Sequence, residues 1–341
     1  MPDYHQPQPG AVQITGLKEV APDLVVVPSR DADLVPNIGV IGGAHSVLIV
    51  ETGMGPGNAE KVLKFAASYA KGRRLYLTTT HFHPEHAFGA QVFAGQATYL
   101  VNRAQADDLA TKGAGYLEMF RGLGEWVARQ LEGVELASPG LLYDGLYDLD
   151  LGGRMVRLRP TGRASNKGDQ VVTVPDAGVI FTGDLVETGQ FSIFPWFPPH
   201  DTDVSGLGWI AVMHRLIDES PLIVVPGHGD FGGPQLLADV RDYLEQLREE
   251  TWRRRRRDER TGHRRASTGR DDPVAPRLGA TRMDGARGRR PLHRTRGLMG
   301  ANPHAHRTSR AGLRRGALTT IYARAAARLS AAAGGAQVTT G

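Results

Sequence analysis

The chain of 341 residues contains no cysteine. Disulfide bonds, thiolate metal ligands and a cysteine nucleophile are therefore excluded, and any metal site has to use histidine, aspartate and glutamate. No apolar run reaches the length of about 18 residues that a membrane helix needs. The first residues show neither the basic segment nor the apolar segment of a secretory leader. These absences predict a soluble, cytoplasmic protein that has no membrane partner.

Lysine, phenylalanine and tryptophan are missing from the last quarter of the chain. Residues 253–341 contain 22 arginines and 5 acidic residues, whereas residues 1–252 contain 19 basic and 31 acidic residues. The two parts have net charges of opposite sign, and they differ in which basic residue they use, so they do not form one compositional unit. We expect a globular domain over 1–252 and a separate basic tail over 253–341.

The tail is also poor in apolar surface, because residues 258–341 contain only one isoleucine and one tyrosine. So little apolar surface cannot offset the chain entropy lost on folding, and the tail is expected to be disordered. One interpretation is a nucleic-acid-binding arm, since arginines neutralise phosphates. However, no aromatic residues are interleaved for base stacking. The other interpretation, which we favour, is a nonfunctional extension translated from a GC-rich gene in a shifted reading frame.

In the first 252 residues, apolar and β-branched runs alternate with amphipathic segments. The predicted strands are 24–27, 37–41, 46–50, 74–79, 97–101, 154–159, 170–174, 179–182 and 222–225. The predicted helices are 58–71, 102–131, 204–218 and 234–251. Hairpins occur beside the strand–helix alternation, which favours mixed sheets with helices outside them. On helix 204–218, His214 falls on the expected apolar face with Leu207 and is predicted to be a core histidine.

Residues 81–86, His-Phe-His-Pro-Glu-His, place three imidazoles and a carboxylate directly after a predicted strand. Side chains of an extended segment alternate in direction, so His81 and His83 point the same way. A turn at Pro84 can bring Glu85 and His86 toward a second point nearby. Such a cluster suits two divalent cations held side by side by nitrogen and oxygen ligands. The alternative is a polar loop whose histidines are solvated.

Three further loops carry polar groups after predicted strands, at Ser165/Asn166/Asp169, at Asp184 and at His228. With the histidine motif, the stretches Phe181-Thr-Gly-Asp184 and Pro226-Gly-His-Gly229, in this order, resemble the metallo-β-lactamase-fold hydrolases. The resemblance covers about residues 20–250. It implies an α/β fold, a four-layer αββα sandwich of two mixed β-sheets, with the metals at one edge between the sheets.

The resemblance also implies roles for individual residues. Six of them would bind two metals: His81 and His83 the first, Glu85, His86 and His228 the second, and Asp184 both. The expected cofactor is Zn²⁺, one or two ions per chain, and Glu85 and Asp184 are the expected catalytic residues. A metal-activated water or hydroxide would attack the carbonyl of a small-molecule ester, lactone, thioester or amide such as a β-lactam.

Two positions depart from the family pattern. Glu85 stands where aspartate is usual, which moves the carboxylate by about 1.5 Å. Ser165 stands where the histidine that is the third ligand of the first metal is expected, and a neutral hydroxyl is a poor zinc ligand. Asn166, Asp169 or a water could supply oxygen instead, although Asp169 is expected to support the loop by hydrogen bonds. The outcomes left open are a dinuclear enzyme, a mononuclear enzyme and a non-catalytic pseudoenzyme, beside a nucleic-acid-associated protein acting through its tail.

Overall fold

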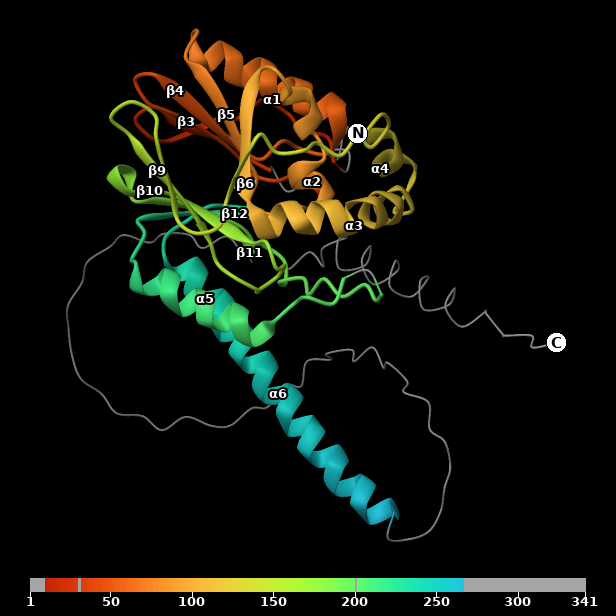
Figure 1. The fold of residues 1–341 in the computed structure, drawn as a ribbon. Coiled ribbons are helices and arrows are strands. Elements are labelled where there is room, and N and C mark those ends of the chain that lie inside the picture. The colour runs from red at the N-terminus through yellow and green to blue at the C-terminus, as the bar shows by residue number, and fades with distance from the viewer. Residues whose placement is uncertain (1–9, 30–31, 200, 267–341) are drawn as a thin grey trace, which may run out of the picture. The chain divides into compact units, whose positions relative to one another are not determined.

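The computed structural model describes residues 10–29, 32–199 and 201–266. Two β-sheets lie at its centre (Figure 1). Going across the first, the strands are β1 (Lys18–Ala21), β2 (Leu24–Val27), β3 (Ile38–Gly42), β4 (Ser46–Val50), β5 (Arg74–Thr78), β6 (Ala97–Asn102) and β7 (Leu141–Tyr143). Going across the second, they are β12 (Ile223–His228), β11 (Val179–Glu187), β10 (Gln170–Val174), β9 (Met155–Pro160) and β8 (Tyr147–Asp150).

Both sheets are mixed. In the first, β1 to β4 pair antiparallel, and β4, β5, β6 and β7 pair parallel. In the second, β8 to β11 pair antiparallel and β11 pairs parallel with β12. Because parallel neighbours end at the same sheet edge, the loops after β4 and β5 emerge together, as do those after β11 and β12. The histidine motif follows β5, whereas Asp184 lies within β11 and His228 is the last residue of β12.

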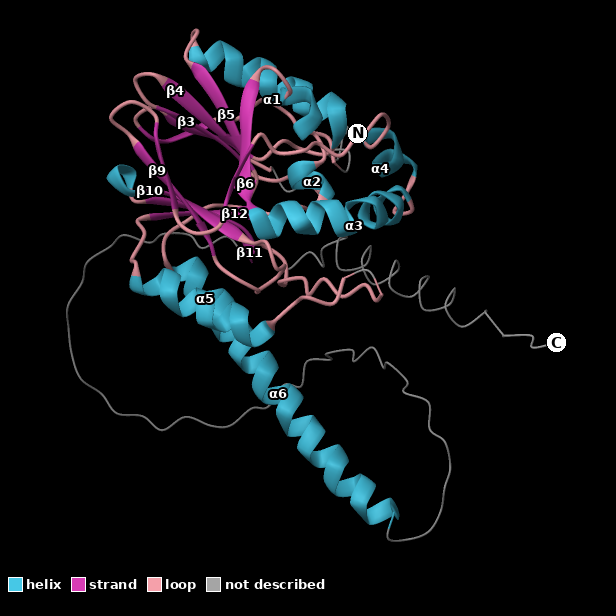
Figure 2. Ribbon diagram, in the orientation of Figure 1, coloured by secondary structure: helices cyan, strands magenta, loops and turns pink. Residues whose placement is uncertain are grey.

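Helices cover the outer faces of the sheets (Figure 2). The α-helices are α1 (Gly55–Ala70), α2 (Pro84–Ala87), α3 (Arg103–Arg121), α4 (Glu125–Gln130), α5 (Gly206–Asp218) and α6 (Gln235–Ala266). Two short 3₁₀ helices, η1 (Ala90–Phe93) and η2 (Pro175–Ala177), complete the described elements. Among these residues, no helix is both long and apolar enough to cross a bilayer.

Three buried clusters hold the layers together. Val62 and Ala66 of α1 pack against the outer face of the first sheet, which includes Val47 and Leu77. Side chains such as Leu48 and Leu158 meet between the two sheets. The outer face of the second sheet packs against buried side chains of α5 and the start of α6, among them Trp209, Met213, Leu237 and Leu244. This order of layers confirms the predicted αββα sandwich.

The apolar face expected for α5 was wrong. His214 is exposed and lies 3.2 Å from Oε1 of Glu245, and Leu207 is exposed as well. Ile210, which lies on the same expected face, is buried, and the rest of the buried face is formed by Trp209, Val212, Met213 and Leu216. Trp209 also donates from Nε1 to the carbonyl of Leu185 at 3.0 Å. Apolar residues surround most of this helix, so periodicity alone could not select the face that the sheet covers.

Helix α6 ends at Ala266, which is 15 residues past its predicted end at 251. The first arginines of the basic segment are therefore helical, and a Glu250–Arg253 pair at 2.7 Å, three residues apart, adds to the helix. Residues 250–266 belong to a separate compact unit of the chain. The border at 252/253 stays a prediction. Residues 267–341, for which disorder was expected, lie outside the described residues.

Gly39 of β3 is required by the close approach of the two sheets. A β-carbon at this position would lie 2.6 Å from Cε1 and Cζ of the buried Phe181 ring on β11. We expect Gly39→Ala to lower the free energy of unfolding by about 1–3 kcal/mol, because core overpacking displaces the ring. Adding Phe181→Leu should recover part of that loss. Urea unfolding measures both effects.

The control is Gly57→Ala in α1, where an added β-carbon meets nothing within 4 Å. This variant should be as stable as the parent or more stable, because alanine favours helix over glycine. Equal losses from both substitutions would show that the contact with Phe181 is not what constrains position 39.

Candidate metal centre

The histidine motif occupies the connection between β5 and α2. The chain leaves the sheet after Thr78, and α2 begins at Pro84. His81 and His83 precede α2 and Glu85 and His86 lie within it, so one tight connection presents all four side chains. Each of the four is at most 4% exposed. The solvated-loop alternative is therefore excluded.

The structure brings the six predicted ligands into two groups that share Asp184. One consists of His81, His83 and Asp184, and the other of Glu85, His86, Asp184 and His228. Within each group the potential ligand atoms all lie within 4.8 Å of one another. The longer side chain of Glu85 is accommodated, because its carboxylate still joins the second group.

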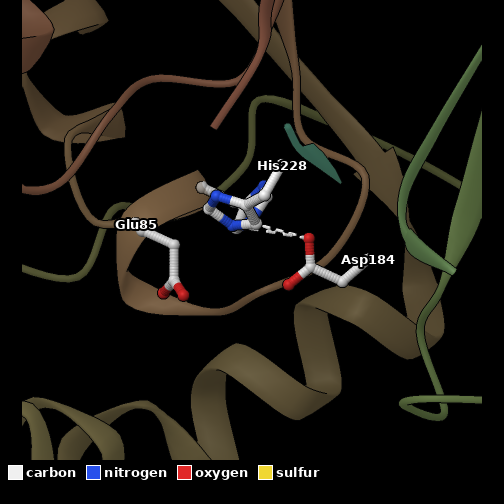
Figure 3. Close-up of side chains that lie close together, drawn as sticks. Glu85, Asp184 and His228 are labelled. Atoms are coloured by element: carbon white, nitrogen blue, oxygen red, sulfur yellow. Dashed lines mark hydrogen bonds and ion pairs between the residues drawn. The ribbon is translucent and has the colours of Figure 1, made fainter. Parts of the chain in front are cut away.

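Asp184 faces the two groups with different oxygen atoms. Its Oδ2 lies 3.5 Å from Nε2 of His81, in the first group. Its Oδ1 lies 3.3 Å from Nε2 of His86 and 3.6 Å from Nε2 of His228, in the second group. Figure 3 shows the contact with His228, with the carboxylate of Glu85 on the other side of the imidazole. A carboxylate in this position can join two cations.

Backbone groups fix the orientation of His228 at the end of β12. Its Nδ1 lies 2.8 Å from the carbonyl oxygen of Val35, which can only accept a hydrogen bond. Nδ1 therefore carries the proton, and the lone pair of Nε2 faces Asp184. Asn37 holds the same loop by donating from Nδ2 to the carbonyls of Pro226 at 3.0 Å and Gly229 at 2.8 Å.

Glu51 supports the motif from the end of β4, and the sequence analysis did not identify it. Its Oε1 accepts from the hydroxyl of Thr80 at 2.6 Å and lies 3.4 Å from Nδ1 of His86. Its side chain is only 2% exposed. A carboxylate on the far nitrogen of a ligating imidazole orients the ring and raises its basicity. The signal was available, because Glu51 directly follows an apolar strand, as Asp184 follows Phe181 and Thr182.

The electrostatics of the cluster suit a cation. Burial lowers the pKa values of His81, His83 and His228, so these rings are neutral and have lone pairs. Burial alone would raise the pKa of Asp184, but the nearby His86, His228 and His81 hold it well below its usual range. His86 behaves differently, since the charges of Asp184 and then Glu51 outweigh burial and raise its pKa.

Several ligand-type atoms in the cluster have no hydrogen-bond partner among the residues that the structure describes. These atoms are Nε2 of His81, both ring nitrogens of His83, Oε2 of Glu85, Nδ1 of His86 and Oδ1 of Asp184. Buried polar atoms are normally paired, because leaving one unpaired costs about 1–3 kcal/mol. Nitrogen and oxygen atoms of this kind, gathered around two points, fit divalent cations such as zinc.

The loop that carries Ser165 attaches to the motif through its backbone, since the amide of Gln170 donates to the carbonyl of Thr80 at 2.9 Å. Ser165 is 2% exposed. Asp169 accepts from the amide of Asn166 at 2.7 Å and from its Nδ2 at 3.3 Å, which confirms the expected supporting role. Burial raises the pKa of Asp169 to about 8. In the described part of the chain, the first group gains no further histidine or carboxylate from this loop.

Glu187 is a second carboxylate that the sequence analysis missed, because the strand was expected to end at residue 182. The strand β11 continues to Glu187, whose side chain is 6% exposed. Its carboxylate accepts from Nε2 of Gln190 at 2.6 Å and from the amide of Ile193 at 3.4 Å. Burial and then the charge of Asp184 raise its pKa well above the usual range. It therefore holds a proton beside the cluster and braces the segment that follows.

A cavity of about 670 Å³ lies at the opposite edge of the sheets and is lined by Gly42, Arg73 and Arg154, among others. Arg154 donates from Nη1 to the carbonyls of Pro22, Asp23 and Gly42. Arg73 is paired with Asp23 at 2.7 Å. The side chains of these two arginines thus connect neighbouring turns through hydrogen bonds and an ion pair. The cavity lies outside the candidate metal centre.

The family model of the metallo-β-lactamase superfamily matches residues 32–228, which is more than half of the chain and includes every predicted ligand. The chain belongs to the metallo-β-lactamase superfamily. This confirms the family predicted from the ordered motifs. Members of the superfamily are mostly metal-dependent hydrolases, and the fold implies a divalent metal, typically zinc.

Solved structures share the fold. A metallo-β-lactamase from Pontibacter korlensis is 16% identical with a TM-score of 0.53, over 67% of this chain and 98% of that one. The stereoselective inverting sec-alkylsulfatase Pisa1 from Pseudomonas sp. is 16% identical with a TM-score of 0.55, over 71% of this chain and 43% of that one. A comparison with curated proteins gave no match. At these identities the likeness shows the fold alone.

The position of Glu51 yields a prediction for the second ligand group. Replacing Glu51 with glutamine removes the negative charge beside Nδ1 of His86 while keeping an oxygen for Thr80. We expect the affinity of the second group for zinc to fall about 10–100-fold, because the imidazole becomes less basic and less well oriented. Competition with a chromophoric chelator measures the dissociation constant.

The matched control is Glu60→Gln, because Glu60 is exposed on α1. It should leave zinc affinity unchanged. If Glu51→Gln and Glu60→Gln bound zinc equally tightly, Glu51 would not be supporting a ligand.

Proposed function

We propose that the protein is a hydrolase that uses a metal-activated water on a carbonyl substrate, namely an ester, lactone, thioester or amide such as a β-lactam. The observation that carries the proposal is a set of buried ligand atoms that lack hydrogen-bond partners among the described residues and form two groups around Asp184. Membership of a superfamily of metal-dependent hydrolases supports it.

Six residues would hold one or two Zn²⁺ ions: His81, His83, Glu85, His86, Asp184 and His228. When bound, a divalent cation supplies Lewis acidity, which lowers the pKa of water toward neutrality and polarises a carbonyl. Glu85 and Asp184 are the carboxylates of the site, and we assign them the catalytic roles. No side-chain nucleophile is required.

The chain contributes orientation and a dry environment. The carbonyl of Val35 sets the tautomer of His228, and Glu51 faces the far nitrogen of His86. Burial lowers the pKa values of His81, His83 and His228, so their lone pairs are available. Glu187, which belongs to neither ligand group, accepts from Gln190, and burial and then the charge of Asp184 raise its pKa well above the usual range.

The segment 191–199 supports an apolar substrate group. Trp196 is 53% exposed, and Phe197 of the same segment is buried against Tyr116 beside the motif, whereas Phe191 stacks on Tyr243 of α6. An exposed aromatic side chain on a segment anchored next to a site offers apolar contact area. The substrate would therefore carry an apolar part.

The two ligand groups differ in completeness. Among the described residues the second has four members and the first has three, and Ser165 stands where the family pattern has a histidine. This favours tighter metal binding in the second group than in the first. The competing proposal is a non-catalytic protein, and the serine at position 165 favours that alternative. Metal analysis and turnover assays distinguish the two.

The direct test is metal analysis of the purified full chain after growth with zinc, combined with turnover of an ester, a lactone, a thioester and a β-lactam. We expect about one or more equivalents of zinc per chain and hydrolysis of at least one substrate. Asp184→Asn should abolish turnover and lower metal content, because both groups lose their shared carboxylate. Absence of both metal and turnover would refute the proposal, and metal without turnover on any substrate would identify a pseudoenzyme.

Position 165 gives a second, constructive test. We expect Ser165→His to tighten metal binding by the first group by at least about tenfold, because an imidazole completes a set of three protein ligands beside the shared carboxylate. The control is Ser68→His on the exposed face of α1, which should change nothing. Unchanged stoichiometry and affinity in Ser165→His would show that residue 165 does not face the first group.

A further inference from the structure

His83 is the one motif histidine whose ring nitrogens both lack a hydrogen-bond partner among the described residues. By contrast, His228 donates to the carbonyl of Val35, and Nδ1 of His81 lies 3.1 Å from the hydroxyl of Thr80. Nδ1 of His86 makes no hydrogen bond within the described residues, but it lies 3.4 Å from the carboxylate of Glu51. Ligating imidazoles are normally oriented by a hydrogen bond on the far nitrogen. Something else must therefore set the orientation of the His83 ring.

That role falls to an aromatic ring. Tyr116 of α3 stacks on His83, with ring centroids 5.0 Å apart and an angle of 24° between the planes. Phe82 contacts both rings edge-on, at 5.1 Å from His83 and 4.8 Å from Tyr116. Because His83 is 4% exposed and Tyr116 is 1% exposed, neither ring has room to turn without displacing the other.

Tyr116 is itself fixed by a charged network. Its hydroxyl donates to Oδ2 of Asp201 at 2.6 Å. Oδ1 of Asp201 accepts from Nζ of Lys112 at 3.1 Å, one helical turn before Tyr116 on α3. Asp201 is 1% exposed and Lys112 is 6% exposed, so the network is shielded from water. A hydrogen bond to a buried carboxylate is stronger than one between neutral groups.

Lys112 joins this network to the loop that carries Ser165. Its Nζ lies 2.9 Å from Oδ1 of Asp108 and 2.8 Å from Oδ2 of Asp203. The other oxygen of Asp108 accepts from the amide of Gly168 at 2.9 Å. Asp108, Lys112 and Tyr116 follow one another at one-turn spacing on α3. They thus connect the Ser165 loop with residues 201–203 and with the ring that stacks on His83.

We propose that Tyr116, fastened by Asp201 and Lys112, is a positioning residue that orients His83 by stacking and so sets the metal affinity of the first ligand group. The proposal rests on the proposed function, since it requires His83 to be a metal ligand. The first group has only three members, so it depends more on the orientation of each imidazole than the second group does. The hydroxyl of Tyr116 acts through the ring and does not contact a metal.

The test first disables one ligand group and then measures the Co²⁺ affinity of the other. The background His228→Ala removes a ligand of the second group alone, and His81→Ala removes one of the first alone. Co²⁺ binding to the full chain, followed by visible absorption and chelator competition, then reports one group in each background. Tyr116→Leu and Tyr116→Phe are placed in both backgrounds, with thermal unfolding recorded for every variant.

We expect Tyr116→Leu to raise the Co²⁺ dissociation constant of the first group by about tenfold or more, the size of effect seen when an orienting partner is lost. The second group should change by less than about twofold. Tyr116→Phe keeps the stacked ring and loses the bond to Asp201, so its effect should fall between those of tyrosine and leucine. This variant also keeps the test valid if Tyr116→Leu does not fold.

The matched control is Phe120→Leu, one turn later on α3 and in the same buried cluster as Tyr116. It should lower the melting temperature and leave the first group's affinity unchanged. The assignment is overturned if Tyr116→Leu behaves like Phe120→Leu, or if it weakens both groups equally. A parent chain that binds no metal at all would overturn the proposed function and this assignment together, whereas unchanged affinity in a metal-binding chain overturns the assignment alone.

Discussion

The burial of imidazoles and carboxylates at one edge of the sandwich is the constraint on which the rest of the structure depends. An uncompensated buried charge costs several kcal/mol, so the groups around Asp184 have to be paired, protonated or bound to a cation. The parallel pairs β4–β5 and β11–β12 make such a cluster possible, since their loops emerge at the same edge. Glu51, Thr80 and the carbonyl of Val35 then hold individual members in place.

The predicted ligands could be found from the sequence because each follows an apolar strand. A strand fixes where its last residue lies, so the order of motifs at His81–His86, Asp184 and His228 carried three-dimensional information. Glu51 and Glu187 occupy equivalent places and were missed for different reasons. Glu51 is the one metal-ligand type of residue in the glycine-rich stretch 51–57, so no motif marks it, and Glu187 lies beyond the point where apolar residues suggested that the strand ends.

The buried face and the end of a helix were harder to predict where apolar and polar residues were not clearly segregated along it. Helix α5 is apolar on most of its circumference, so choosing a face from spacing placed His214 inside and left Trp209 out. Helix α6 shows the converse case. Its apolar pattern stops near residue 251, but arginine is a good helix former and needs no core to continue a helix that has already started. Spacing and apolar content therefore predicted which segments are helical better than they predicted where helices end or face.

Ser165 separates what a fold requires from what a site requires. Its loop is fixed by the hydrogen bonds from Asn166 to Asp169 and by the attachment to Thr80, which do not involve the side chain of residue 165. Among the described residues the first ligand group has three members and the second has four. The packing of Tyr116 against His83 therefore has more to contribute in the first group.

The ligands come from both sheets, so a bound cation would affect the stability of the fold. His81 follows the first sheet and Asp184 belongs to the second, and a cation between them would close a loop of about 100 residues. In chain-entropy terms a crosslink of that span is comparable to a long-range disulfide, at about 4–5 kcal/mol. In a chain without cysteine, a bound cation would thus be a reversible crosslink between the two sheets. It would add to the hydrogen bonds that Asn37 donates to the carbonyls of Pro226 and Gly229.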